Sequence, residues 1–164
     1  MLVELKKIFE NEGNVLPLEA EIDLSDVKQR GESLFKTPVS VRGEVANHLG
    51  IVTLKATARF TYCAPCDRCA EQVEREFETP VEHSLVVSLN NDDNDDFLVV
   101  ENMKLDVDEL IRSDVLLSLP TKYLCKEDCK GLCSHCGANL NLGACSCAKE
   151  VDPRLSALLE LMDN

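Results

Sequence analysis

The sequence CKEDCKGLCSHCGANLNLGACSC, residues 125–147, contains six of the nine cysteines in the chain. Thiolates at such short spacings converge on a tetrahedral metal ion, and zinc is the usual occupant. The surrounding stretch, 121–150, has too few apolar side chains to form a core of its own. A bound metal is therefore expected to give this part of the chain a defined shape.

The clearest metal-binding pattern here is a knuckle, in which two cysteines three positions apart are followed by Gly137. The glycine allows backbone amides to turn toward the thiolate sulfurs and to stabilise their negative charge. A second pair follows, and because its members are two positions apart they point to one side of an extended chain. The two pairs predict one structural zinc site, formed by Cys133, Cys136, Cys145 and Cys147. His135 lies inside the knuckle, but four cysteines are enough to complete the site.

The remaining cysteines allow a second zinc site. An earlier run, residues 63–69, holds three cysteines with two residues between neighbours. One pair from this run and the first pair of the tail would form a second site, made of Cys66, Cys69, Cys125 and Cys129. Two alternatives stay open: Cys63 could replace Cys66 as a ligand, or the earlier run could consist of free thiols under reducing conditions.

Alternating apolar and polar side chains predict an antiparallel sheet. The clearest strand is 52–62, and similar alternation occurs at 16–24, 39–45 and 73–89. A period of two is typical of strands with one buried face. The run 63–70 joins two of these strands, so the first cysteine group is expected at a hairpin tip.

Two helices are predicted near the end of the chain. Asp106 is a suitable N-cap with Glu109 three residues later, which predicts a helix near 106–118. Pro153 in the first helical position predicts a second helix, 153–162. Because so short a helix is marginal alone, its apolar stripe should pack on the domain or bind a partner. The stripe consists of Leu155, Leu158, Leu159 and Met162.

These elements predict an α+β fold: a mostly antiparallel, twisted and barrel-like sheet, one main helix, a cysteine-rich zinc-binding tail and a short C-terminal helix. We expect a β-rich domain over residues 1–120, with the tail, 121–164, packed on it.

The formal charge of −13 disfavours nucleic-acid binding, which requires a basic face. Zinc adds to the acidity, since four thiolates around Zn²⁺ leave a site with a charge of about −2. A protein partner with a basic surface suits this charge better. No stretch approaches the roughly 20 apolar residues of a membrane helix, and the start of the chain lacks a signal pattern. We expect a cytoplasmic protein with reduced thiols.

No catalytic residue is expected. The chain has no phosphate-binding loop, no dinucleotide fingerprint and no arrangement of serine, histidine and aspartate that predicts a hydrolase. A Cys-x2-Cys pair can be a redox motif, but here strands are predicted on both sides of it, unlike in a thioredoxin-like unit. The acidic run 90–96 lacks the glycine and final glutamate of a calcium loop.

The tail from Cys125 to Cys147, followed by Asp152-Pro-Arg-Leu155, closely resembles that of the YceD family, described as large ribosomal RNA subunit accumulation proteins. A second marker of the family, Cys-x-Arg-Cys after a strand, is matched by Cys66-Asp-Arg68-Cys69. The resemblance implies an accessory factor for accumulation of the large-subunit (23S) ribosomal RNA, with no known catalytic activity. We therefore expect a non-enzymatic protein with no small-molecule substrate. The acidic charge adds that it would act through a ribosomal or assembly protein rather than by gripping RNA. The alternatives are a thiol or iron redox protein and a zinc-ribbon regulator that binds nucleic acid.

Overall fold

The computed structural model describes residues 1–88 and 97–147 of the 164-residue chain. The chain divides into two compact units. The first, called the sheet unit below, consists of Met1–Ala64 and Gln72–Tyr123. The second, the cysteine unit, consists of Pro65–Glu71 and Leu124–Asn164. The boundary therefore differs from a single cut after residue 120, because residues 65–71 of the hairpin tip belong with the tail.

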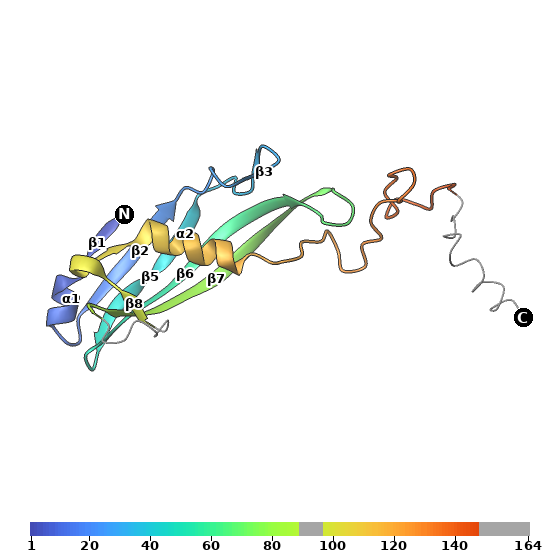
Figure 1. Cartoon of the computed structure of the whole chain (residues 1–164). Helices are drawn as coiled ribbons and strands as arrows, with labels where there is room; N and C mark the ends of the chain where they lie inside the picture. The colour runs from blue at the N-terminus through green and yellow to red at the C-terminus, as the bar shows by residue number, and fades with distance from the viewer. Residues whose placement is uncertain (89–96, 148–164) are drawn as a thin grey trace, which may run out of the picture. The chain divides into compact units, whose positions relative to one another are not determined.

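The sheet unit contains a five-stranded sheet in the order β2-β5-β6-β7-β8 (Figure 1). Its strands are β2 (Val15–Ile22), β5 (Val39–His48), β6 (Ile51–Pro65), β7 (Gln72–Val86) and β8 (Phe97–Val99). The β2–β5 and β5–β6 pairs are antiparallel, whereas β8 runs parallel to β7. The sheet is curled into an open half-barrel. It is mostly antiparallel, as predicted, but has one parallel edge strand.

The hairpin between β5 and β6 shows why these strands pair in this register. Leu49 and Gly50 both have positive φ, 53° and 82°, as a tight hairpin turn requires. Further along the pair, Gly43 lies opposite Ala56. A side chain at Gly43 would place its Cβ only 2.2 Å from the Lys55 carbonyl oxygen, so the close approach of these strands needs glycine.

Smaller elements complete the unit. Two short antiparallel pairs form: β1 (Leu2–Glu4) with β9 (Lys104–Asp106), and β3 (Lys28–Gln29) with β4 (Glu32–Ser33). The helical segments are α1 (Lys6–Glu10), the 3-10 turn η1 (Glu101–Met103) and α2 (Val107–Ser118).

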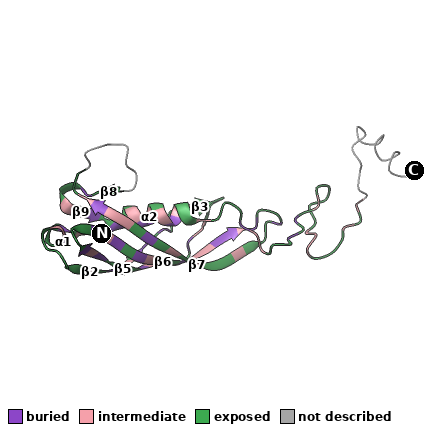
Figure 2. Cartoon of the chain, turned by 90° about the horizontal axis from the view of Figure 1, so that it is seen from below, coloured by how far each residue is buried: buried purple, intermediate pink, exposed green. Residues whose placement is uncertain are grey.

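The core lies between the sheet and α2, which crosses one face of the sheet (Figures 1 and 2). Alternate residues of the long strands are buried, as the banding in Figure 2 shows. Helix α2 occupies the residues predicted to be helical and contributes Val107, Ile111 and Val115 to the core. The side chain of Asp106 accepts a hydrogen bond from the Asp108 amide, which is N-cap geometry.

Aromatic side chains gather where the chain leaves the sheet unit. Tyr123 is 5% exposed, and its hydroxyl lies 3.2 Å from the carbonyl oxygens of both Tyr62 and Val73. Its ring also contacts the rings of Tyr62 and Phe77 edge-on or tilted. These contacts hold Tyr123, the last residue of the sheet unit, against β6 and β7.

Some predictions fall on residues outside the described ranges. The second helix, 153–162, with Leu155, Leu158, Leu159 and Met162, lies beyond residue 147, and the acidic run 90–96 lies within 89–96. The packing of the tail on the β-rich domain stays a prediction. In the described part of the chain no helix combines the length and apolar character that a membrane span demands.

Candidate metal centres

Eight of the nine cysteines gather in two clusters, both inside the cysteine unit. The first cluster is formed by Cys66, Cys69, Cys125 and Cys129, and the second by Cys133, Cys136, Cys145 and Cys147. Within each cluster all four sulfur atoms lie within 4.8 Å of one another. The structure thus brings together the same two sets of four that the sequence spacings predict.

The sulfur separations suit a metal ion better than a disulfide bond. The Sγ atoms are 3.8 Å apart in Cys66–Cys129 and 3.6 Å apart in Cys69–Cys125, and in the second cluster Cys145 and Cys133 are 3.4 Å apart. Four thiolates bound at about 2.3 Å to one tetrahedral ion are about 3.8 Å apart, whereas a disulfide bond is about 2.05 Å long. All nine cysteines are free thiols.

The first cluster joins two distant parts of the sequence. Two of its cysteines lie on the connection between β6 and β7, and the other two follow α2. Cys66, Cys69 and Cys129 are buried, and Cys66 is only 3% exposed. Burial in this way excludes water and leaves a closed, four-sulfur site.

The second cluster is built within one stretch of the chain and is more open. Cys136 is exposed, and the other three members are half-buried. A metal ion there would be closer to solvent and to competing ligands than one in the first cluster.

Each cluster contains the same backbone knuckle. The Cys66 amide donates to the Glu71 carbonyl at 2.8 Å, and the Ala70 amide donates back to the Cys66 carbonyl at 2.9 Å. In the second cluster the bonds have the same spacing and nearly the same lengths: from Cys133 to Ala138 at 2.8 Å and from Gly137 to Cys133 at 2.9 Å. The sequence shows the shared Cys-x2-Cys spacing but does not show that the two turns are the same.

The residue after each second knuckle cysteine adopts a left-handed conformation. Gly137 has φ of 72°, which glycine adopts without strain, and Ala70 has φ of 59°, which costs an L-residue about 1–2 kcal/mol. This turn directs backbone N–H groups toward the first cysteine of the knuckle.

Backbone N–H groups lower the pKa of the first knuckle cysteine in both clusters. For Cys66, burial raises the pKa, but the amides of Cys125, Cys69 and Arg68 outweigh it and bring the value to about 6. For Cys133, hydrogen bonds from the amides of Cys136 and His135 bring the pKa to about 6. Both residues are therefore held as thiolates, the form that binds metal, at neutral pH.

Other members have the opposite shift, Cys69 and Cys125 in the first cluster and Cys147 in the second. The Glu71 amide lowers the pKa of Cys69, but burial and the neighbouring thiols raise it to about 12. Contact with Cys136, together with burial, raises the pKa of Cys147 to about 12. In the absence of metal each cluster therefore keeps protons, because four adjacent thiolates repel one another. A divalent cation would displace these protons.

Arg68 and Asn141 are supporting residues: the sequence pointed to Arg68 only as part of the Cys-x-Arg-Cys marker, without a role, and did not point to Asn141. The Arg68 guanidinium donates to the Cys129 carbonyl at 2.8 Å, and the Arg68 carbonyl accepts from the Leu132 amide at 3.1 Å. The Asn141 side-chain amide lies 3.3 Å from the Cys129 sulfur. Such contacts orient metal ligands, but no spacing rule in the sequence would have found them.

Cys63 belongs to neither cluster. It lies in the sheet unit, where its sulfur is 4.0 Å from the Gln72 side-chain oxygen and where its proximity raises the pKa of Lys36. Of the two candidate pairs in the earlier run, the structure gathers Cys66 and Cys69.

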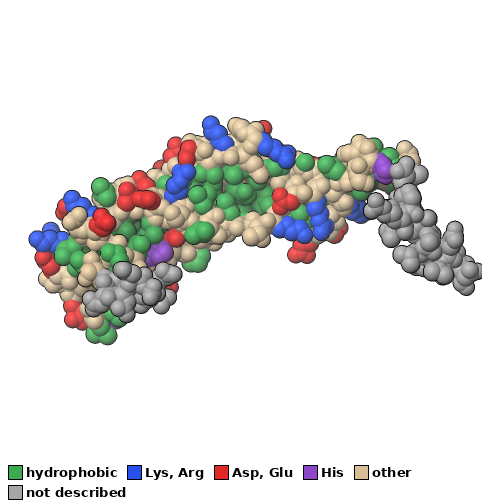
Figure 3. Space-filling view, viewed as in Figure 1, with side chains coloured by type: hydrophobic (Ala, Val, Ile, Leu, Met, Phe, Trp, Pro, Cys, Tyr) green, Lys and Arg blue, Asp and Glu red, His purple; other side chains and the backbone are tan. Residues whose placement is uncertain are grey.

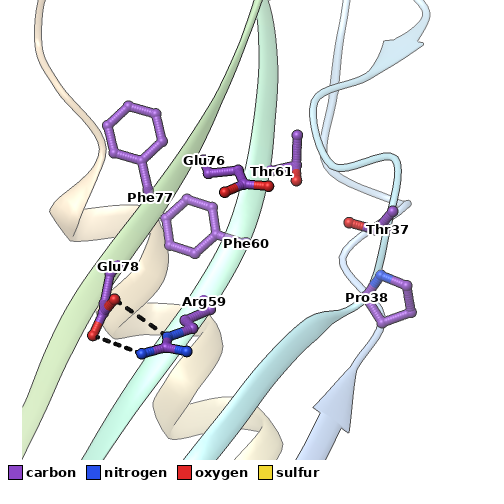
Figure 4. A pocket seen from close by; sticks show the side chains of 8 residues that line it. All are labelled: Thr37, Pro38, Arg59, Phe60, Thr61, Glu76, Phe77 and Glu78. Atoms are coloured by element: carbon purple, nitrogen blue, oxygen red, sulfur yellow. Dashed lines mark hydrogen bonds and ion pairs between the residues drawn. The ribbon is translucent and has the colours of Figure 1, made fainter.

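Another candidate site on the sheet unit is a polar pocket of about 580 Å³ between β6, β7 and residues 37–38 (Figure 4). Arg59 and Glu78 pair across it, with contacts of 3.2 and 3.3 Å, while Phe60 and Phe77 stack beside them. Figure 3 shows charged side chains of both signs interspersed over the visible face of this unit. The pocket lining holds no cysteine, serine or histidine to serve as a nucleophile or base.

The fold and the clusters define a mostly β protein with two cysteine clusters that could each hold a metal ion. The chain belongs to the YceD family: the family model described as large ribosomal RNA subunit accumulation protein YceD matches residues 54–162. The match begins in β6 and includes every cysteine.

Known relatives are similar over most of the chain. Two are named large ribosomal RNA subunit accumulation protein YCED homolog 1, chloroplastic. The Arabidopsis thaliana protein is 29% identical over 70% of this chain and 45% of its own length, and the Zea mays protein 27% identical over 68% and 49%. The chain thus spans about half the length of these two relatives. The uncharacterized protein YlbN of Bacillus subtilis is 27% identical over 86% of this chain and 84% of its own length. No solved structure matches.

Proposed function

We propose that this protein is a non-enzymatic, zinc-binding accessory factor for accumulation or processing of large-subunit (23S) ribosomal RNA, and that it acts in the cytoplasm through a protein partner. The observation that carries the proposal is the pair of four-sulfur clusters in a chain of this family. Two relatives carry large ribosomal RNA subunit accumulation in their names.

Zinc is the metal that these ligands favour. A set of four thiolates suits Zn²⁺ in a closed tetrahedral site, and such sites are structural because no coordination position is left for substrate. Catalytic zinc sites normally keep three protein ligands and one open position, so the ligand sets favour a non-enzymatic role.

The charge of the molecule favours a basic protein as partner. The formal charge is −13 before metal binding, and two tetrathiolate zinc sites would each carry about −2. On the exposed side of β7, Glu74, Glu78 and Glu82 pair with basic residues of the same unit, whereas Glu76 forms no ion pair with any described residue. A net charge of this size attracts basic ribosomal or assembly proteins and repels RNA phosphates.

Three measurements test the proposal. Elemental analysis of protein purified under reducing conditions without chelator should give two zinc ions per chain. Cells that lack the protein should have a lowered ratio of 23S to 16S ribosomal RNA, restored by the wild type but not by a variant in which both Cys66 and Cys133 are serine. A ribonuclease-treated pulldown should retain a basic ribosomal or assembly protein. Submicromolar binding of the purified protein alone to 23S RNA fragments at physiological salt would contradict the protein-partner mechanism.

A thiol redox protein is the second candidate, since the lowered pKa of Cys66 and Cys133, about 6, is a property of reactive cysteines. This alternative predicts a metal-free protein with a reversible disulfide couple, or a coloured protein if the metal is iron. A colourless protein with stoichiometric zinc would exclude it.

A further inference from the structure

We propose that Asn141 is a positioning residue that couples the two metal centres, so that occupancy of the second cluster strengthens metal binding at the first. The inference rests on the zinc-binding part of the proposed function. It concerns a residue that is not itself a metal ligand and whose contacts cross from one cluster to the other.

The position of Asn141 in the sequence is unusual for a residue that contacts the first cluster. It lies in the segment between Cys136 and Cys145, which joins the two ligand pairs of the second cluster. Its side chain nevertheless contacts Cys129, a member of the first cluster.

Both the nitrogen and the oxygen of the Asn141 side-chain amide contact the segment that carries Cys129. Its nitrogen donates to the Cys129 sulfur at 3.3 Å, and its oxygen accepts from the Lys130 amide at 2.9 Å. The backbone and side-chain nitrogens of Asn141 both lie 2.9 Å from the Asn139 side-chain oxygen, which fixes the loop.

Backbone contacts also hold three segments together: the segment around Arg68, residues 129–132 and the loop that carries Asn141. The Leu140 amide donates to the Gly131 carbonyl at 2.9 Å, and Leu132 pairs with Asn139 in an antiparallel bridge. On the other side of the 129–132 segment, Arg68 accepts from the Leu132 amide and donates to the Cys129 carbonyl. A Cβ at Gly131 would lie 3.1 Å from the Arg68 carbonyl oxygen, so these segments are in close contact.

Metal in the second cluster would fix both ends of the loop that carries Asn141. The loop would then hold the side-chain amide on the Cys129 sulfur without a further loss of conformational entropy when the first cluster binds metal. Residues that orient metal ligands by such hydrogen bonds typically change metal affinity by about 10-fold to 100-fold. By linkage, filling the first cluster strengthens the second by the same factor.

The test follows each centre separately by NMR of the full-length chain in a zinc-buffered titration under reducing conditions. The Ala70 amide reports filling of the first cluster and the Gly137 amide filling of the second, because each closes its own knuckle. The chains compared are the wild type, Asn141→Ala, a second-cluster knockout (Cys133→Ser with Cys136→Ser), and the knockout combined with Asn141→Ala. Leu142→Ala is the matched control, since this neighbouring side chain is 83% exposed.

The Ala70 midpoint is the free zinc concentration at which half of the Ala70 amide signal has changed. Coupling predicts that Asn141→Ala and the knockout each raise this concentration by about 10-fold. The two changes together should add little to either alone, because both remove the same interaction. Leu142→Ala should behave as the wild type. An Ala70 midpoint that is unchanged in the knockout, or fully additive effects of the two changes, would overturn the inference. If zinc moved neither amide in the wild type, the proposed zinc binding itself would be wrong.

Discussion

The two units of this protein are stabilised by different groups. In the sheet unit, Val, Leu, Ile and Phe side chains from the strands and α2 fill the core. In the cysteine unit, the buried residues among those described are three cysteines and one glycine: Cys66, Cys69, Cys129 and Gly131. Its leucines at positions 132 and 142 are exposed. The hydrophobic effect can therefore account for the first unit but not for the second, whose shape we propose to come from metal–sulfur bonds and the hydrogen bonds around them.

The largest expected effect comes from removing one ligand of the buried cluster. Cys66→Ser should abolish metal binding there, because a hydroxyl is a poor substitute for a thiolate, and should leave one zinc per chain. Structural zinc contributes on the order of 10 kcal/mol in small zinc modules, so the first cluster should lose its fixed geometry. Metal analysis measures the stoichiometry. Cys63→Ser is the matched control and should keep two zinc ions, since Cys63 lies outside both clusters.

A substitution in the apolar core should have the opposite effect: it should destabilise the sheet unit and leave the metal sites intact. Ile111 is fully buried in α2, and Ile111→Ala should destabilise the sheet unit by about 2–5 kcal/mol through the cavity that it leaves. Metal content should remain that of the wild type. Chemical denaturation followed by a probe in each unit measures both effects, and a loss of zinc in the folded variant would show that the units are not independently stabilised.

Acidification should release metal before it unfolds the sheet unit. The pKa of Cys66 and of Cys133 is lowered from 9.0 to about 6, so their thiolates stabilise the folded cysteine unit fully above pH 9 and no longer do so below pH 6. Protons also compete for the sites at Cys69 and Cys147, whose raised pKa makes metal binding release protons. Zinc affinity should therefore fall steadily as the pH is lowered from 9 to 6. Equilibrium dialysis with zinc measures this affinity across the range. A zinc affinity that stayed constant from pH 9 to pH 6 would contradict the account.

The smallest effects should come from the residues that close the two knuckles. Gly137→Ala should weaken zinc binding at the second cluster by about 1–2 kcal/mol, because an L-residue is strained at a φ of 72°. Ala70→Gly should relieve a similar strain at the first cluster and strengthen binding there by up to about 1 kcal/mol. Competition with a chromophoric chelator resolves both changes. If both substitutions changed zinc affinity in the same direction and by the same amount, the two turns would not share one conformation.

Sequence patterns predicted the long strands and the residues of α2 because periodicity and capping are local properties. The spacing of the cysteines also predicted the two groups of four that the structure brings together. The pairing of β1 with β9 and the parallel alignment of β8 could not be predicted, since each depends on contacts between residues far apart in the sequence. For the same reason the contacts of Arg68 and Asn141 with Cys129 could not be predicted, although Arg68 was part of the Cys-x-Arg-Cys marker.

The most direct test compares amide hydrogen exchange in the zinc-loaded and zinc-stripped full chain under reducing conditions. The account predicts that stripping removes protection at the knuckle amides of Ala70 and Gly137, whereas Val45 and Leu54 in the sheet keep theirs. A metal-free chain that still protects Ala70 and Gly137 as strongly as the loaded one would contradict the claim that sulfur-bound metal shapes the cysteine unit.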